Sequence, residues 1–177
     1  GNLTSGVFIN KTRFLSPRQG QQGAFVQYRA GSAGTFGINY LHQNEGGESD
    51  VLSVRALSPL YSSTEIDVEY GISGGSGLRD DAFSLRLFGN EPGISYEARY
   101  IDAGPGYRGY FRDLKLKTLT VTAEPWRYLR LEGYFRDEER NVAHDSLRAS
   151  APKDVYYQFG VGYHDRVSLS YRSGEQK

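Results

Sequence analysis

Two short segments carry residue types that occur in catalytic or cofactor sites. Gly104–Gly109 (Gly-Pro-Gly-Tyr-Arg-Gly) matches the Gly-x-Gly-x-x-Gly pattern of dinucleotide-binding loops. That pattern requires a parallel strand before it and a helix after it, and no helical periodicity follows Gly109. His144, Asp145 and Ser146 supply the residue types of a hydrolytic triad, but sequence neighbours cannot place a base between a nucleophile and an orienting group. Both segments are therefore predicted to be polar loops, and no catalytic residue and no enzymatic activity are predicted.

Acidic and histidine residues are the candidate metal ligands of this chain. Glu65, Asp67 and Glu69 share one face of a predicted strand and could approach a hard cation. The alternative is an acidic ladder that faces water or pairs with Arg55 or Arg86 on neighbouring strands. The histidines lack the close spacing of a transition-metal site; they are His42, His144 and His164. No metal site and no cofactor are predicted.

Composition excludes several classes of function. The chain has 21 basic and 21 acidic residues, so it lacks the basic excess of a nucleic-acid-binding domain. It has no cysteine, which excludes disulfides and thiolate chemistry. It has no methionine and begins at Gly1, so we expect a processed or excised piece of a protein.

A two-residue alternation of apolar and polar side chains runs through the whole chain. In Thr64–Ile72, for example, Ile66, Val68 and Tyr70 alternate with acidic residues. This period is typical of β-strands, whose successive side chains leave opposite faces of a sheet. The sequence therefore predicts one all-β domain over residues 1–177, an antiparallel up-and-down meander of about ten to twelve strands. The expected strands are Gly6–Leu15, Gly23–Ala30, Thr35–His42, Val51–Leu57, Thr64–Ile72, Ala82–Phe88, Ile94–Asp102, Leu114–Ala123, Arg127–Asp137, Val155–Tyr163 and Arg166–Arg172.

Short and long connections alternate along this meander, so all short turns are expected at one end of the sheet and all long loops at the other. The short ones are Gly31–Gly34, Pro59–Ser63, Gly89–Gly93, Glu124–Trp126 and His164–Asp165. The long ones are Gln43–Asp50, Ser73–Asp81, Ala103–Asp113 and Glu138–Asp154. Bacterial outer-membrane barrels have this arrangement of connections.

The hairpin Thr120–Asn141 resembles hairpins of large Gram-negative outer-membrane barrels, with a Pro and an aromatic at the turn and an aromatic, Arg/Asp-rich end to the returning strand. Tyr-Phe-Arg-Asp occurs at Tyr110–Asp113 and again at Tyr134–Asp137, and both copies are expected at the long-loop end. The hairpin is also similar in its residue pattern to the barrel that sheathes multihaem cytochromes in metal-reducing bacteria. The resemblance implies a porin-like transmembrane barrel of the outer membrane, in contact with lipid. An odd strand count and a final strand without a terminal aromatic depart from it, so we expect a segment of a larger barrel or an open sheet.

The alternation assigns side chains to the two faces of such a barrel wall. Expected to face lipid are Phe36, Ile38, Ile66, Val68, Phe83, Leu85, Leu87, Ile94, Phe159, Val161, Val167 and Leu169. Expected to line the lumen and set its selectivity are Arg55, Glu65, Asp67, Glu69, Arg86, Glu97, Arg99 and Arg172. Expected at the membrane interface are Tyr61, Tyr100, Tyr110, Trp126, Tyr128, Tyr134 and Tyr163.

Two main functional hypotheses follow, beside a weaker third one, a barrel enzyme whose catalytic residues converge from distant strands. In the first, the chain is an outer-membrane β-barrel, or a large part of one, that acts as a porin-like channel or as a structural sheath for a protein partner inside or alongside it. In the second, it is a periplasmic or secreted β-sheet protein that binds glycan or protein through exposed tyrosines and loops. The same alternation fits this hypothesis, because a soluble sheet also hides one face of each strand.

Overall fold

The computed structural model describes residues 1–11, 20–44, 48–61, 63–75, 78–143, 153–163 and 167–176. Within them the chain forms eleven strands and one short 3-10 helix, η1 (Gly31–Ala33). The strands are β1 (Asn2–Lys11), β2 (Gly20–Arg29), β3 (Thr35–Gln43), β4 (Ser49–Tyr61), β5 (Thr64–Gly75), β6 (Leu78–Glu91), β7 (Ile94–Ala103), β8 (Leu114–Trp126), β9 (Leu129–Arg140), β10 (Lys153–Tyr163) and β11 (Val167–Gln176). The prediction of an all-β fold is confirmed.

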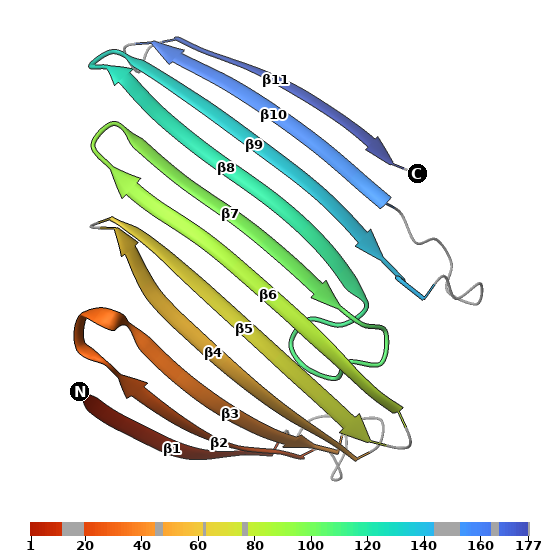
Figure 1. The fold of residues 1–177 in the computed structure, drawn as a ribbon. Helices are drawn as coiled ribbons and strands as arrows, with labels where there is room; N and C mark the ends of the chain where they lie inside the picture. The colour runs from red at the N-terminus through yellow and green to blue at the C-terminus, as the bar shows by residue number, and fades with distance from the viewer. Residues whose placement is uncertain are drawn as a thin grey trace.

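The eleven strands form one sheet in which every strand pairs with its sequence neighbours (Figure 1). All ten pairings are antiparallel, so the topology is the predicted up-and-down meander. Among the described residues no ladder joins β1 to β11, and these two strands are the edges of an open sheet. None of the described residues belongs to a helix long and apolar enough to cross a membrane.

The strands are longer than the sequence predicts at several connections. The expected loop Ser73–Asp81 is largely strand, because Ser73 pairs with Asp80 and Gly74 with Arg79 across the β5–β6 ladder. The expected turn Glu124–Trp126 belongs to β8, where a shift in register lets the chain accommodate Pro125. The turn itself lies at residues 127–128, which were expected to begin the next strand.

The connections nevertheless separate as predicted into two ends of the sheet. Strands β2, β4, β6, β8 and β10 finish at one end of the sheet, here called the turn end. Strands β1, β3, β5, β7 and β9 finish at the other, here called the loop end. Most of the β9–β10 connection, including His144, Asp145 and Ser146, lies outside the described residues, as does His164.

Register assigns every paired side chain to a face, because directly opposed residues point the same way. One face carries Ile38, Val54, Tyr70 and Phe83 in a single row across β3 to β6, and is called the apolar face. The other carries Asp67, Arg86 and Arg99 in a row across β5 to β7, and is called the polar face.

The buried core lies on the polar face, at the loop end. It consists of Val51, Ala82, Ile101, Ala103 and Tyr107. The first four project from β4, β6 and β7, and Tyr107 comes from the β7–β8 loop that lies over them. Burial in this molecule is therefore achieved by a loop folded onto a sheet, while the apolar face has no such cover from the described residues.

Candidate functional site

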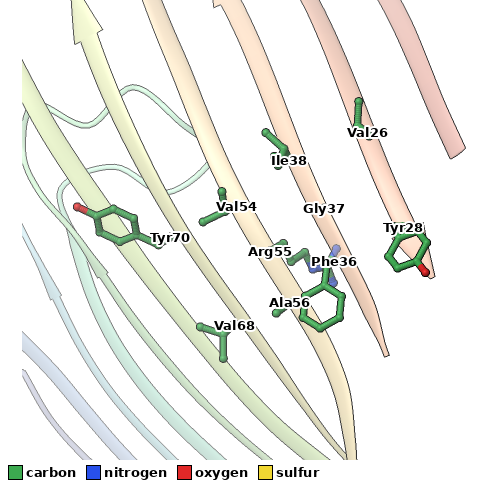
Figure 2. Close-up of a pocket in the computed structure, with 10 residues that line it drawn as sticks. All are labelled: Val26, Tyr28, Phe36, Gly37, Ile38, Val54, Arg55, Ala56, Val68 and Tyr70. Carbon is green, nitrogen blue, oxygen red and sulfur yellow. The ribbon is translucent and has the colours of Figure 1, made fainter. Parts of the chain in front are cut away.

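The apolar face exposes most of the large apolar side chains that are exposed in this structure. All twelve residues predicted to face lipid lie on it, as the pairings show. Individual exposures reach 54% for Ile38, 59% for Phe159 and 75% for Leu169. A shallow apolar hollow of about 440 Å³ lies on this face between side chains of β2 to β5 (Figure 2). An exposed apolar surface that crosses several strands is a candidate contact surface.

The edge of the apolar surface that lies towards the loop end is slanted relative to the strands. On β3, β6, β7, β9 and β11 the last apolar-face residues before polar or charged ones are Tyr40, Phe83, Tyr100, Phe135 and Tyr171. Each of these residues belongs to a row of directly opposed residues that crosses the sheet, so β5 can serve as a common scale for all five. The five rows cross β5 at Ile72, Tyr70, Val68, Ile66 and Thr64, in that order. The edge therefore moves by about one residue per strand. With ~3.3 Å per residue and ~4.8 Å between strands, this corresponds to strands tilted by about 35° from the normal to that edge.

Charged side chains occupy the apolar-face positions beyond this edge and form a rim at the loop end. The rim consists of His42, Asp50, Arg79, Asp81, Asp102, Lys115, Lys117, Asp137, Glu139, Lys153 and Glu175. Its charges are mixed and partly paired, for example Lys153 with Asp137 at 3.7 Å between Nζ and Oδ1.

One rim cluster shifts the titration of its members. The Tyr40 hydroxyl donates to Asp50 Oδ1 at 2.6 Å, and His42 Nδ1 lies 2.9 Å from the same oxygen. These two hydrogen bonds, Tyr40's first, lower the pKa of Asp50 below its usual value. The bond to Asp50 raises the pKa of His42. Each shift favours the charged form of its own side chain.

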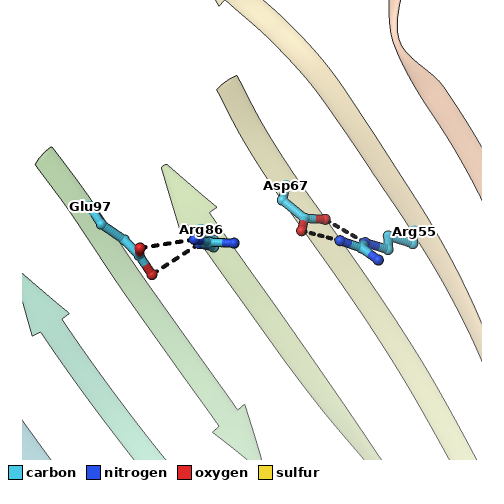
Figure 3. Close-up of polar contacts among 4 residues, drawn as sticks. All are labelled: Arg55, Asp67, Arg86 and Glu97. Carbon is cyan, nitrogen blue, oxygen red and sulfur yellow. Dashed lines mark hydrogen bonds and ion pairs between the residues drawn. The ribbon is translucent and has the colours of Figure 1, made fainter. Parts of the chain in front are cut away.

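The polar face gathers all eight residues predicted to line a lumen. Four of them form a ladder of two bidentate ion pairs across β4 to β7 (Figure 3). Arg55 bonds to Asp67 at 2.8 and 2.6 Å, and Arg86 bonds to Glu97 at 2.9 and 2.9 Å. Asp67 lies directly opposite Arg86 across the β5–β6 ladder, so the two pairs are neighbours. Charges on this part of the face thus alternate in sign along the ladder.

A second group of ion pairs lies on β9. Arg130 Nε is 2.8 Å from Glu132 Oε1. The buried carboxylate of Glu138 is bonded by both Arg136 and Arg140. Arg172, the last of the predicted lumen residues, lies opposite Gln158 on the edge strand β11. Arg side chains thus lie beside carboxylates on both halves of the polar face.

The β7–β8 loop, residues 104–113, covers the polar face at the loop end. Tyr107 is only 6% exposed, and its hydroxyl lies against Gly71, where a Cβ would collide with it. Burial raises the pKa of Tyr107, and the charge of Glu69 raises it further. Phe111 lies beneath the Arg99 guanidinium, 5.0 Å from ring centroid to Cζ. The loop that matches the dinucleotide pattern is therefore a docked cover, and the chain resumes as strand β8 after it.

Hydrogen bonds from three strands hold the same loop. The Arg108 amide donates to Ser73 Oγ at 3.0 Å, and the Gly106 amide donates to Asp80 Oδ2 at 2.8 Å. The Gln43 side-chain amide donates to the Arg108 carbonyl. Sequence reasoning missed this docking, since its only local signal is the cluster of glycines in the loop.

The seven predicted interface aromatics separate into groups. Tyr61, Trp126, Tyr128 and Tyr163 lie at the turn end. Tyr100 lies on the apolar face at the edge towards the loop end, and Tyr110 is 94% exposed in the β7–β8 loop. Tyr134 lies instead on the polar face, opposite Thr120 and Gln158. Alternate residues of β9 point to opposite faces, and Tyr134 belongs to the set that points to the polar face. It lies apart from the other six predicted interface aromatics, and its ring contacts that of Tyr156.

The described part of the chain holds no cluster of three or more His, Asp or Glu side chains suited to a metal ion. What the arrangement provides is an apolar surface bounded by a charged rim, backed by a polar, ion-paired surface. Comparison of the chain with models of known protein families, with curated proteins and with solved structures found no match.

Proposed function

We propose that this chain is a membrane-spanning β-sheet that forms the wall of an outer-membrane barrel, with its apolar face in lipid and its polar face toward an aqueous lumen. In this role it acts as a porin-like channel wall or as a sheath around a protein partner. Membrane lipid is then its main partner, and the proposal assigns it no catalysis.

The slanted edge of the apolar surface carries the proposal. Strands of outer-membrane barrels tilt by about 35–45°. The flat boundary of the membrane therefore crosses each successive strand at a different residue. A shift of about one residue per strand corresponds to a tilt of about 35°. The strands are 9 to 14 residues long, against the ~9–11 residues that a membrane-spanning strand needs.

The two borders of the apolar surface support the same assignment. Trp126 and the turn-end tyrosines provide amphipathic rings of the kind that gather at a membrane interface. The rim at the loop end places charge where the apolar surface stops. On the polar face, the Arg55–Asp67 and Arg86–Glu97 pairs would be costly in hydrocarbon but suit a wet lumen.

Insertion into vesicles tests the proposal. Trp126 is the single tryptophan, so its fluorescence reports the turn end of β8 alone. We expect refolding with vesicles of bacterial lipid to shift Trp126 emission to shorter wavelength and to make it quenchable by lipids brominated near the headgroup. A well-folded chain that stays in buffer, without quenching, would contradict the proposal and favour a soluble glycan- or protein-binding sheet. Efflux of small solutes from the same vesicles then separates a channel wall from a sheath.

A further inference from the structure

A hollow on the polar face lies near the turn end, away from the docked loop, and is called the Phe88 hollow. It has a volume of about 440 Å³, and its lining includes Glu65, Arg86, Phe88, Asn90 and Glu97. Phe88 lies directly opposite Glu65 on one side and Glu97 on the other. An aromatic ring is thus set between two carboxylates in a wet surface.

The ring of Phe88 is held in place by a fixed cation. The Arg86 guanidinium lies over it, with Cζ 4.5 Å from the ring centroid. Glu97 clamps that guanidinium through Nε and Nη2, both at 2.9 Å, and Nη1 takes no part in the clamp. A stacked and clamped Arg loses little further side-chain entropy when a ligand arrives, so the hollow is preorganised.

The groups around the hollow combine three properties. Arg86 and Asn90 offer N–H donors, Glu65 and Glu97 offer carboxylate acceptors, and Phe88 offers an apolar ring. Arg86 and Glu97 neutralise each other, and Glu65 adds one negative charge to the lining, so an anionic ligand is disfavoured. A sugar carries hydroxyls that both donate and accept, and C–H faces that pack on an aromatic ring. Pockets of about 300–1,000 Å³ are the usual size for small ligands.

We infer that the Phe88 hollow is a binding site for a neutral sugar of two rings. This inference rests on the proposed function in that it names the class of solute for the proposed lumen. The Arg86–Glu97 pair orients the site and covers one face of Phe88. Glu65 and Asn90 bond to sugar hydroxyls, and the face of Phe88 that Arg86 does not cover packs against the sugar ring.

Binding is measured on the detergent-folded chain labelled with 15N, titrated separately with maltose, cellobiose and lactose. We expect at least one sugar to give saturable shifts of the Phe88 and Asn90 amides. Phe88→Ala is expected to weaken that binding by about tenfold or more. Glu65→Gln, which keeps the shape of the side chain, is expected to weaken it as well and guards against misfolding of the Phe88 variant.

Matched controls are Phe159→Ala, which removes the same ring from the apolar face, and Glu69→Gln, which lies further along the same face of β5. Neither is expected to change sugar affinity. No saturable shift with any of the three sugars, or binding that survives both Phe88→Ala and Glu65→Gln, would overturn the inference. Because the titration uses no bilayer, sugar binding without insertion into vesicles would refute the membrane role alone. Insertion without sugar binding would refute the Phe88 hollow alone.

Discussion

Tyr107 is the residue on which the docking of the β7–β8 loop depends most. Its ring is buried on the polar face, and Gly71 leaves the space that its hydroxyl occupies. Removing a buried aromatic side chain costs about 3–5 kcal/mol. We expect Tyr107→Ala to release the loop and to raise the rate of tryptic cleavage after Arg108 and Arg112 by at least about tenfold, measured by mass spectrometry on the folded chain.

Tyr110 provides the matched control for that experiment. It lies in the same loop but is 94% exposed, so Tyr110→Ala removes little buried area. Cleavage in Tyr110→Ala should remain at the wild-type rate. Equal cleavage of the two variants would show that the loop is not held by Tyr107.

The His42–Asp50 pair makes the rim sensitive to pH. The folded pKa of His42 is raised above 6.5, so its contribution to stability is full below 6.5 and is lost as pH rises through the raised value. The folded pKa of Asp50 is lowered below 3.8, so its contribution is present above 3.8 and is lost as pH falls through the lowered value. The pair is therefore most stabilising in mildly acidic solution.

An NMR titration of the His42 ring measures this pair directly. We expect a midpoint above 6.5 in the wild type and a lower midpoint in Asp50→Asn, which removes the carboxylate charge. Asp81→Asn on the same rim serves as the control and should leave the midpoint unchanged. An unshifted midpoint in Asp50→Asn would show that the hydrogen bond does not form.

Assignment of residues to faces was predictable because it depends on local alternation. A run such as Ile66, Val68 and Tyr70 keeps its parity whatever the rest of the chain does, and the ladders place it as predicted. Tyr134 shows the limit of reasoning from proximity to a turn or loop. Its parity, which the flanking Leu131 and Phe135 already indicate, puts it on the polar face.

Single strands carry the strongest test of which face meets lipid. Val121 and Thr122 are neighbours on β8 and point to opposite faces; Val121 lies opposite Tyr96 and Gly133, and Thr122 opposite Ser95 and Glu132. In the proposed membrane role, Val121→Arg places a cation near the middle of the apolar surface, at a cost of about 2–4 kcal/mol. Thr122→Arg places the same side chain beside Glu132 on the polar face.

We expect Val121→Arg to reduce insertion into vesicles severalfold and Thr122→Arg to insert like the wild type. The measurement is the fraction of chain that floats with vesicles in a density gradient. A loss of insertion in Thr122→Arg alone would mean that the two faces have the opposite roles.

The sequence predicted which strands each connection joins but predicted the lengths of the connections less well. The glycines and acidic residues of Ser73–Asp81 suggested a long loop, yet they continue the β5–β6 ladder because backbone hydrogen bonds do not depend on side-chain type. The Tyr110–Asp113 and Tyr134–Asp137 repeats were expected at the loop end, and both lie towards that end in different kinds of structure. The first lies in the docked loop and the second within β9, because the loop folds onto residues from β3, β5 and β6 that are remote in sequence.

At the scale of the whole sheet, the two edge strands determine how the wall can close. In an up-and-down meander of eleven strands, β1 and β11 run in the same direction. Joining them would create a parallel ladder in a sheet whose ten ladders are all antiparallel. An odd number of further strands between these edges would keep every ladder antiparallel. We therefore expect the edges to stay apart within one chain.

Engineered cysteines test this closure, since the chain has none of its own. Thr4 on β1 and Ser170 on β11 both lie on the polar face, and Thr4 lies directly opposite Gln27 on β2. Under mild oxidation we expect the pair Thr4→Cys with Gln27→Cys to form a disulfide within one chain, because opposed residues on adjacent strands have Cα atoms about 4.5–5.5 Å apart. The pair Thr4→Cys with Ser170→Cys should form none within a chain, as shown by migration on a non-reducing gel. If this pair instead closed as completely as the control, the eleven strands would form a complete barrel by themselves, with one parallel ladder.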